Sequence, residues 1–271
     1  MRTQPVISME ALKHYTPAAF GTPSENVSNR YAYVPTHEVL TMLHDEGFVI
    51  TKAVQTGYRN NKSDFGKHMI RLRHRNFENP QELGIGGLIP EIVMINSHDA
   101  KSSFKIMAGL FRLVCLNGMI VPQGPNQKNV IRHFGNAEQV VNAVFDVVKT
   151  VPLVMNNAKE MSTINLTEVE KDVFANAASE LRWPTGEIDA PKRVNPQYLL
   201  TPKRHDDNKN DLWTTFSVVQ ENMLKGGTPA YNRGRMRRSK PIKAINEDVR
   251  LNKALWMLAD QMKQIKLEEA A

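Results

Sequence analysis

The chain has 271 residues, of which 41% are hydrophobic, so it is long and apolar enough for one large domain or two small ones. Thirty-five Lys and Arg against 28 Asp and Glu give a formal net charge of +7, which favours anionic partners or serves solubility. One cysteine excludes an intramolecular disulfide. No apolar run reaches the ~20 residues of a membrane span, and the first residues do not read as a signal peptide. We therefore expect a cytoplasmic protein without a membrane partner.

The first half of the chain is predicted to combine helix and strand. Residues 1–33 lack periodicity and indicate an irregular arm with one short helix at 9–14. Thr36 is placed to cap the next helix. Alternating or continuous apolar runs then predict strands. The expected elements are a helix at 37–46, strands at 48–55, 67–75 and 89–97, and a further strand followed by a buried segment at 103–119.

The second half is predicted to be mainly helical. Asn136 precedes apolar residues at helical spacing, and Thr167 opens a capping box for a helix to about residue 184. A long connection at 184–210 precedes two last helices, 211–225 and 246–266. The fold class is therefore α+β, with an N-terminal helix and a small antiparallel sheet in β-β-β-α order before a helical C-terminal half. The expected regions are an arm at 1–33, a core at 34–135 and a helical region at 136–271 packed with the core as one domain.

The predicted strand at 67–75 carries a row of cations. Side chains two residues apart share one face of a strand, so one face presents cations while Ile70 and Leu72 point into the core. A spacing of about 6.5 to 7 Å between alternate residues suits contacts with a phosphodiester backbone. The alternative is a solvated face, or an edge protected by charge. The candidate nucleic-acid-binding residues here are Lys67, Arg71, Arg73 and Arg75.

A second basic feature is the linker at 225–243 between the last two predicted helices. It contains seven cations and no acidic residue, together with an aromatic side chain that can stack on a base. Its Gly and Pro residues indicate a flexible arm that becomes ordered on a polyanion. A solvated charge run is the alternative. The candidate binding residues here are Tyr231, Arg233, Arg235, Arg237, Arg238 and Lys240.

Signals for catalysis are weak. The run Ser97, His98 and Asp99 suggests turn chemistry, because consecutive side chains at a strand end point in different directions and do not converge as a triad. No pair of histidines or cysteines has the spacing of a zinc site. We therefore expect no catalytic residues, no metal site, no cofactor and no enzymatic activity. A metal-dependent nuclease using Glu91, His98 and Asp99 stays open as an alternative.

Several segments resemble one protein family closely, from about Arg30 nearly to the end of the chain. They are residues 30–36, 67–73, 90–99, 111–119, 210–215, 220–227 and 250–256. On these segments the chain resembles the bacterial, prophage and plasmid proteins of domain-of-unknown-function family 932. The resemblance implies a mobile-element setting, in which recombination, replication and counter-defence are common, but it supplies no catalytic residues.

The order helix, three antiparallel strands, helix is also that of the single-strand annealing proteins, which assemble into rings and line a groove with cations. This is a fold-level analogy. Together with the charge pattern it favours a phage or plasmid protein that binds single-stranded DNA, or anneals it in recombination, as a homo-oligomeric ring. The sequence does not decide between DNA and RNA. The alternative is a counter-defence or regulatory protein that binds a host protein.

Overall fold

The computed structural model describes residues 5–28, 31–57, 64–77, 87–100, 102–113, 117–122, 130–131, 136–184, 193–232 and 235–269. The chain divides into two compact units, residues 1–154 and 155–271. The predicted mixed α+β class is confirmed, with helices and an antiparallel sheet in the first half and mainly helix in the second. Among the described residues, no helix is both long and apolar enough to cross a membrane.

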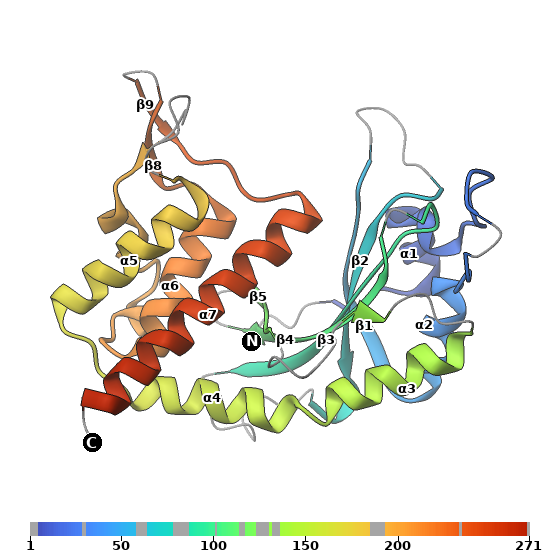
Figure 1. Ribbon diagram of the computed structural model, residues 1–271, viewed down its shortest axis with the longest axis horizontal. Coiled ribbons are helices and arrows are strands. Elements are labelled where there is room, and N and C mark those ends of the chain that lie inside the picture. The colour runs from blue at the N-terminus through green and yellow to red at the C-terminus, as the bar shows by residue number, and fades with distance from the viewer. Residues whose placement is uncertain are drawn as a thin grey trace. The chain divides into compact units, whose positions relative to one another are not determined.

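The first unit is an antiparallel sheet with helices on one face (Figure 1). Its central strands follow the order β1-β2-β3-β4-β5, and β6 pairs with β4. Each of the strands predicted at 48–55, 67–75 and 89–97 is found within one residue of its expected ends. The elements are α1 (Met9–Tyr15), α2 (Thr36–Asp45), β1 (Phe48–Gln55), β2 (His68–His74), β3 (Leu88–Asn96), β4 (Phe104–Arg112), β5 (Asn117–Ile120), β6 (Val130–Ile131) and α3 (Ala137–Val148).

The hydrophobic core of this unit lies between the sheet and its helices. Ile70 of β2 pairs with Met94 of β3, and Leu72 pairs with Ile92, so one face of both strands is apolar. These side chains pack with apolar residues of α1, α2 and α3. The alternation of the strands and the helical spacing of α3 therefore place one apolar layer against another, as two-layer domains require. The elements contribute Leu12, Val39, Leu40, Leu43, Phe104, Ile106, Val140 and Val144, among others.

The start of α2 is fixed by a buried hydroxyl rather than by the expected cap. The prediction that Thr36 caps the helix is wrong, because Thr36 is already its first residue and Pro35 stands at the cap without a side-chain hydrogen bond. The Thr36 hydroxyl lies 2.9 Å from His68 Nε2 and 3.2 Å from His98 Nε2, and it accepts from Asn96 Nδ2 at 3.1 Å. One hydroxyl thus ties α2 to the ends of two strands.

The contacts of this cluster indicate the tautomer of His68. His68 Nδ1 lies 3.0 Å from the Gly66 carbonyl, which only accepts, so His68 carries its proton on Nδ1. The Thr36 hydroxyl is then placed to donate to His68 Nε2, and His98 Nε2 lies within hydrogen-bonding distance of the same oxygen. Burial of both rings favours their neutral form. Burial lowers the pKa of His68 to about 4 and, with the nearby His68, that of His98 to about 3.

The second unit contains the C-terminal helices and a small sheet (Figure 1). Helix α6 is its centre, since every residue from Leu212 to Leu224 is buried. The capping box at Thr167 and the end of α6 before Gly226 are as predicted. The boundary between the units falls within α4. The elements from there on are α4 (Val151–Thr163), α5 (Glu168–Arg182), β7 (Arg193–Val194), α6 (Leu212–Lys225), β8 (Pro229–Asn232), β9 (Arg235–Arg238) and α7 (Ile245–Glu269).

Buried polar contacts hold α6 in the second unit. Gln220 donates to Asn252 Oδ1 on α7 at 2.7 Å, and Asn252 donates to the Asp248 carboxylate at 2.8 Å. On another side, Arg204 forms a bidentate ion pair with Glu221, with both N···O distances at 2.8 Å. This pairing helps to lower the pKa of the Glu221 carboxyl against the opposing effect of burial. Such contacts satisfy polar groups that would otherwise be costly to bury.

We expect acid to destabilise the first unit through His68 and His98. Both side chains take up a proton in the unfolded chain near pH 6.5, whereas the folded pKa values are about 4 and 3. The stability that these groups contribute is present above pH 6.5 and is lost as the pH falls. Between pH 7 and pH 5.5 the free energy of unfolding should decrease by about 1 kcal/mol per histidine.

Urea denaturation at several pH values measures this decrease. NMR titration of the histidine ring protons provides a second readout that does not depend on a variant folding. Two imidazoles that stay neutral at pH 5.5 are expected. A titration of every histidine near pH 6.5 in the folded protein would contradict the assignment.

Candidate nucleic-acid interface

The predicted cationic face of β2 is buried at its two central arginines. Arg71 is 2% exposed and Arg73 is 5% exposed. Both point to the sheet face opposite Ile70 and Leu72, as the alternation predicts, but that face is not open to solvent at these positions. The prediction of solvent-facing cations is therefore wrong for Arg71 and Arg73.

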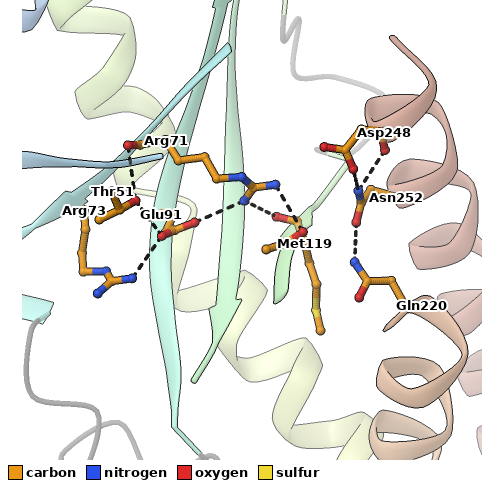
Figure 2. A network of polar contacts seen from close by, with 9 residues as sticks. Thr51, Arg71, Arg73, Glu91, Met119, Gln220, Asp248 and Asn252 are labelled. Atoms are coloured by element: carbon orange, nitrogen blue, oxygen red, sulfur yellow. Dashed lines mark hydrogen bonds and ion pairs between the residues drawn. The ribbon is translucent and has the colours of Figure 1, made fainter. Parts of the chain in front are cut away.

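The physical reason is a buried acid on the neighbouring strand. Glu91 on β3 accepts from Arg71 Nη1 at 3.2 Å and from Arg73 Nη2 at 3.1 Å (Figure 2). Thr51 on β1 donates to the same carboxylate at 3.1 Å. A charge buried at this depth is stable only when it is paired and hydrogen-bonded. Both arginines are thus paired with Glu91 inside the protein, and residues of three strands form one polar network.

Two glycines make room for the Arg71 side chain across the sheet. A Cβ atom at Gly118 would lie 2.5 Å from Arg71 Nη1, and one at Gly109 would lie 3.4 Å from the same atom. The guanidinium donates to the carbonyls of Gly118 and Met119 on β5 at 3.2 and 3.3 Å (Figure 2). Arg71 therefore crosses from β2 to β5 over positions without side chains, which is a structural role.

The two flanking cations of the predicted row lie outside β2. Lys67 precedes the strand and is half-buried, whereas Arg75 begins a short 3-10 helix (Arg75–Phe77) and is exposed. Arg75 Nη2 lies 3.4 Å from His44 Nε2. The row of four is thus reduced to two accessible ends separated by two buried ion pairs, and the structure does not bring it together as one surface.

The alternative nuclease site is not assembled either. The Glu91 carboxylate is occupied by Arg71, Arg73 and Thr51, while His98 is bound in the Thr36 cluster. Within the described ranges, no group of three or more His, Cys, Asp or Glu side chains has the geometry to hold a metal ion.

The basic linker forms a β-hairpin instead of a flexible arm. β8 and β9 pair antiparallel, and β7 pairs with the other side of β8, which gives the order β7-β8-β9. The prediction of an unstructured linker is therefore wrong for 229–232 and 235–238, because their backbone groups are satisfied by strand pairing. We call residues 229–240 the basic hairpin. Arg233 lies outside the described residues.

The hairpin is anchored at its base. Gly226 ends α6 with φ at +68°, and a Cβ atom there would lie 2.6 Å from the Ser239 carbonyl oxygen, so this position favours glycine. Gly227 donates to the Ser239 carbonyl at 2.9 Å, and Ser239 donates to the Thr228 carbonyl at 2.8 Å. Arg182 on α5 donates to the carbonyls of Met223 and Lys240. The two ends of the hairpin are thus tied to the helices.

Beyond this base, the hairpin presents its cations to solvent. Every residue of β9 is exposed, and so are Tyr231 and Lys240. Arg238 donates to the Gly227 carbonyl at 2.7 Å. In the part of the chain that the structure describes, none of the exposed hairpin cations is paired with a carboxylate, in contrast to the arginines of β2. They are Arg235, Arg237, Arg238 and Lys240.

Comparison with known proteins identifies the family. A family model described as Domain of unknown function (DUF932) matches residues 23–256. The chain belongs to this family. Two relatives from Escherichia coli strain K12, the UPF0380 proteins YafZ and YfjQ, are each 33% identical over 259 residues, which is 94% of this chain and 91% of each relative. No solved structure matches the chain.

Sequence reasoning missed two parts of this arrangement. Glu91 was the signal for the buried pairs, because a lone acid inside the apolar strand 88–96 needs a buried counter-charge. Met236 lies among the arginines of the linker, and its sequence context does not mark it as a surface residue beside Tyr231. Only the strand register, which pairs Met236 with Tyr231, shows that the two side chains are neighbours.

We expect Glu91→Gln to destabilise the protein strongly. The substitution keeps the shape of the side chain but leaves Arg71 and Arg73 buried without a counter-charge, and breaking such a pair costs about 3–5 kcal/mol. Glu25→Gln, at an exposed position of the same unit, is the matched control and should change the free energy of unfolding by less than about 0.5 kcal/mol. Urea denaturation monitored by circular dichroism measures both. Equal stability of the two variants would contradict a structural role for the Arg71 and Arg73 pairs.

Proposed function

We propose that this protein binds nucleic acid through the basic hairpin and does so without catalysing a reaction. The observation that carries the proposal is the group of exposed cations on β9 and at Lys240, in a segment that contains no acidic residue from 225 to 243. A charge cluster of this kind, on an ordered hairpin, is suited to neutralise successive phosphates.

The geometry of β9 supports phosphate contacts on both of its faces. Arg235 and Arg237 alternate with Met236, so they share one face at a spacing of about 6.5 to 7 Å, while Arg238 lies on the other. Arginine binds phosphate oxygens with several parallel N–H groups. Because the strand pairing fixes the backbone, less conformational entropy is lost on binding than with a disordered arm.

The finer parts of the hypothesis rest on the sequence. Annealing of complementary strands, assembly into a ring and a phage or plasmid setting are proposed from the order of elements and from the family resemblance. Lys67 and Arg75 remain candidates for an additional contact, as does Arg233 between the two hairpin strands. A nucleic-acid-binding role would be exercised in the cytoplasm, which stays the expected compartment.

Binding of a host protein is the second candidate, and the position of β9 favours it. β9 is the outer strand of the order β7-β8-β9. An outer strand can pair with an extended segment of another protein, and its arginines would select an acidic one. Capture of a stoichiometric host protein that persists after nuclease treatment, together with no binding of purified oligonucleotides, would favour this function over the first.

Replacing the hairpin arginines should abolish most of the binding. We expect the triple variant Arg235→Gln, Arg237→Gln, Arg238→Gln to bind a fluorescent 20-nucleotide single strand at least about tenfold more weakly at low salt. The slope of log affinity against log salt should fall by about 2, since each phosphate contact on a single strand contributes about 0.7. Fluorescence anisotropy at several salt concentrations measures both quantities.

The matched control removes the same charge elsewhere on the second unit. Lys159, Lys203 and Lys209 are exposed, and their triple change to Gln also lowers the net charge by three. This variant should keep nearly the wild-type affinity. Equal losses in the two triple variants would mean that only net charge matters, and wild-type binding that does not weaken with salt would refute the phosphate contacts.

A further inference from the structure

The solvent face of the basic hairpin carries two large apolar side chains side by side. Tyr231 of β8 is paired in register with Met236 of β9. Tyr231 is 57% exposed and Met236 is 54% exposed. Directly opposed side chains in an antiparallel pair have Cβ atoms about 4.5 to 5.5 Å apart, so the ring and the thioether lie next to each other. Tyr231 and Met236 form one apolar patch on an otherwise cationic hairpin.

The hairpin holds this apolar patch in a defined orientation. On the opposite face, Ala230 is 1% exposed and Val194 is 4% exposed, and these two residues are paired in register. One face of β8 is therefore buried in the second unit, and the strand alternation turns Tyr231 to solvent. The tyrosine ring is presented by paired backbone on both sides, since β8 lies between β7 and β9.

One arginine shares the face of this apolar patch, and two more lie on the other face of β9. Arg238 shares the face of Met236, two residues along β9, and Arg235 and Arg237 are its neighbours in sequence on the other face. An exposed ring with Arg238 on its own face and two further arginines on the same strand matches the two chemistries of a single-stranded nucleic acid, namely a base with an exposed π-face and the phosphates that flank it. In a duplex the faces of the bases are covered by their neighbours, so the ring has no partner there.

We propose that Tyr231, supported by Met236, stacks on an unpaired base, and that this contact makes the hairpin select single strands over duplexes. The inference rests on the proposed function, because the arginines must first hold the phosphates. It extends that function by naming the residue that determines specificity and the group that it recognises. A deoxyribose and a ribose strand offer the same base face, so DNA and RNA are separate arms of the test.

The test compares single and double strands with variants at position 231. Wild type, Tyr231→Ala and Tyr231→Phe are titrated with fluorescent dT20, U20 and a 20-base-pair duplex at constant salt. Alanine should weaken binding of the single strands by about tenfold or more and leave duplex binding within about twofold, whereas phenylalanine should retain single-strand affinity. Tyr198→Ala, at another exposed tyrosine (40%) of the same unit, is the control and should change neither.

A spectroscopic arm detects stacking directly. In Tyr231→Trp the indole replaces the ring at the same place, and its fluorescence should be quenched by dT20 and not by the duplex. Circular dichroism verifies that each variant is folded.

The outcomes separate the two proposals. Base stacking is overturned if Tyr231→Ala loses single-strand and duplex binding by the same factor, or if single strands leave the indole fluorescence of Tyr231→Trp unquenched. In either case the salt-dependent binding by the arginines stands. An absence of salt-dependent binding by the wild type to every probe overturns both proposals. Quenching by dT20 but not by U20 confines the contact to DNA and keeps the stacking.

Discussion

The carboxylate of Glu91 lies between two buried guanidinium groups, and this contact makes Arg71 and Arg73 unavailable to a partner. One acid and two arginines are buried in a sheet at low cost only if their hydrogen bonds are largely satisfied, and here Thr51, Arg71 and Arg73 share the Glu91 carboxylate across β1, β2 and β3. The long reach of Arg71 also requires glycine at position 118 on β5. The two buried arginines of β2 therefore stabilise the sheet and are not available for binding.

The surplus of positive charge thus separates into two kinds. On β2 the arginines form ion pairs with a carboxylate and donate hydrogen bonds to carbonyl oxygens. Their charge therefore contributes to the stability of the first unit. On β9 the arginines extend into solvent from a hairpin that is fixed at its base, and no carboxylate within the described ranges neutralises them. The same residue type has opposite consequences because one strand is covered and the other is an exposed edge. Binding to an anionic polymer is the role that suits the second kind.

Much of the fold could be predicted from the sequence, because periodicity and capping are local signals. The strand at 48–55 and the capping box at Thr167 are found where they were expected. The burial of Arg71 could not be predicted in the same way, since alternation tells which residues share a face but not whether that face is covered. Likewise, Thr36 had the residue type of a cap, and only the approach of His68 and His98 gives its hydroxyl another use. Long-range contacts decide such cases.

The hairpin likewise has features that the sequence predicts and features that it does not predict. Composition identified the segment 225–243 as basic and pointed to Tyr231 as an aromatic within it. Gly and Pro in the linker favoured disorder, but pairing with the two residues of β7 and the contacts at Ser239 give it a fixed shape. The apolar neighbour of Tyr231 follows from register alone, which a linear pattern does not supply.

Photo-crosslinking tests most directly whether the partner lies on the hairpin and not on the sheet. A single strand that contains 4-thiothymidine is bound at low salt, irradiated and digested with the protein, and the modified peptides are mapped by mass spectrometry. We expect crosslinks in the peptides that contain Tyr231 and Met236 and none at Arg71 or Arg73. Crosslinks confined to residues 67–75 would contradict it.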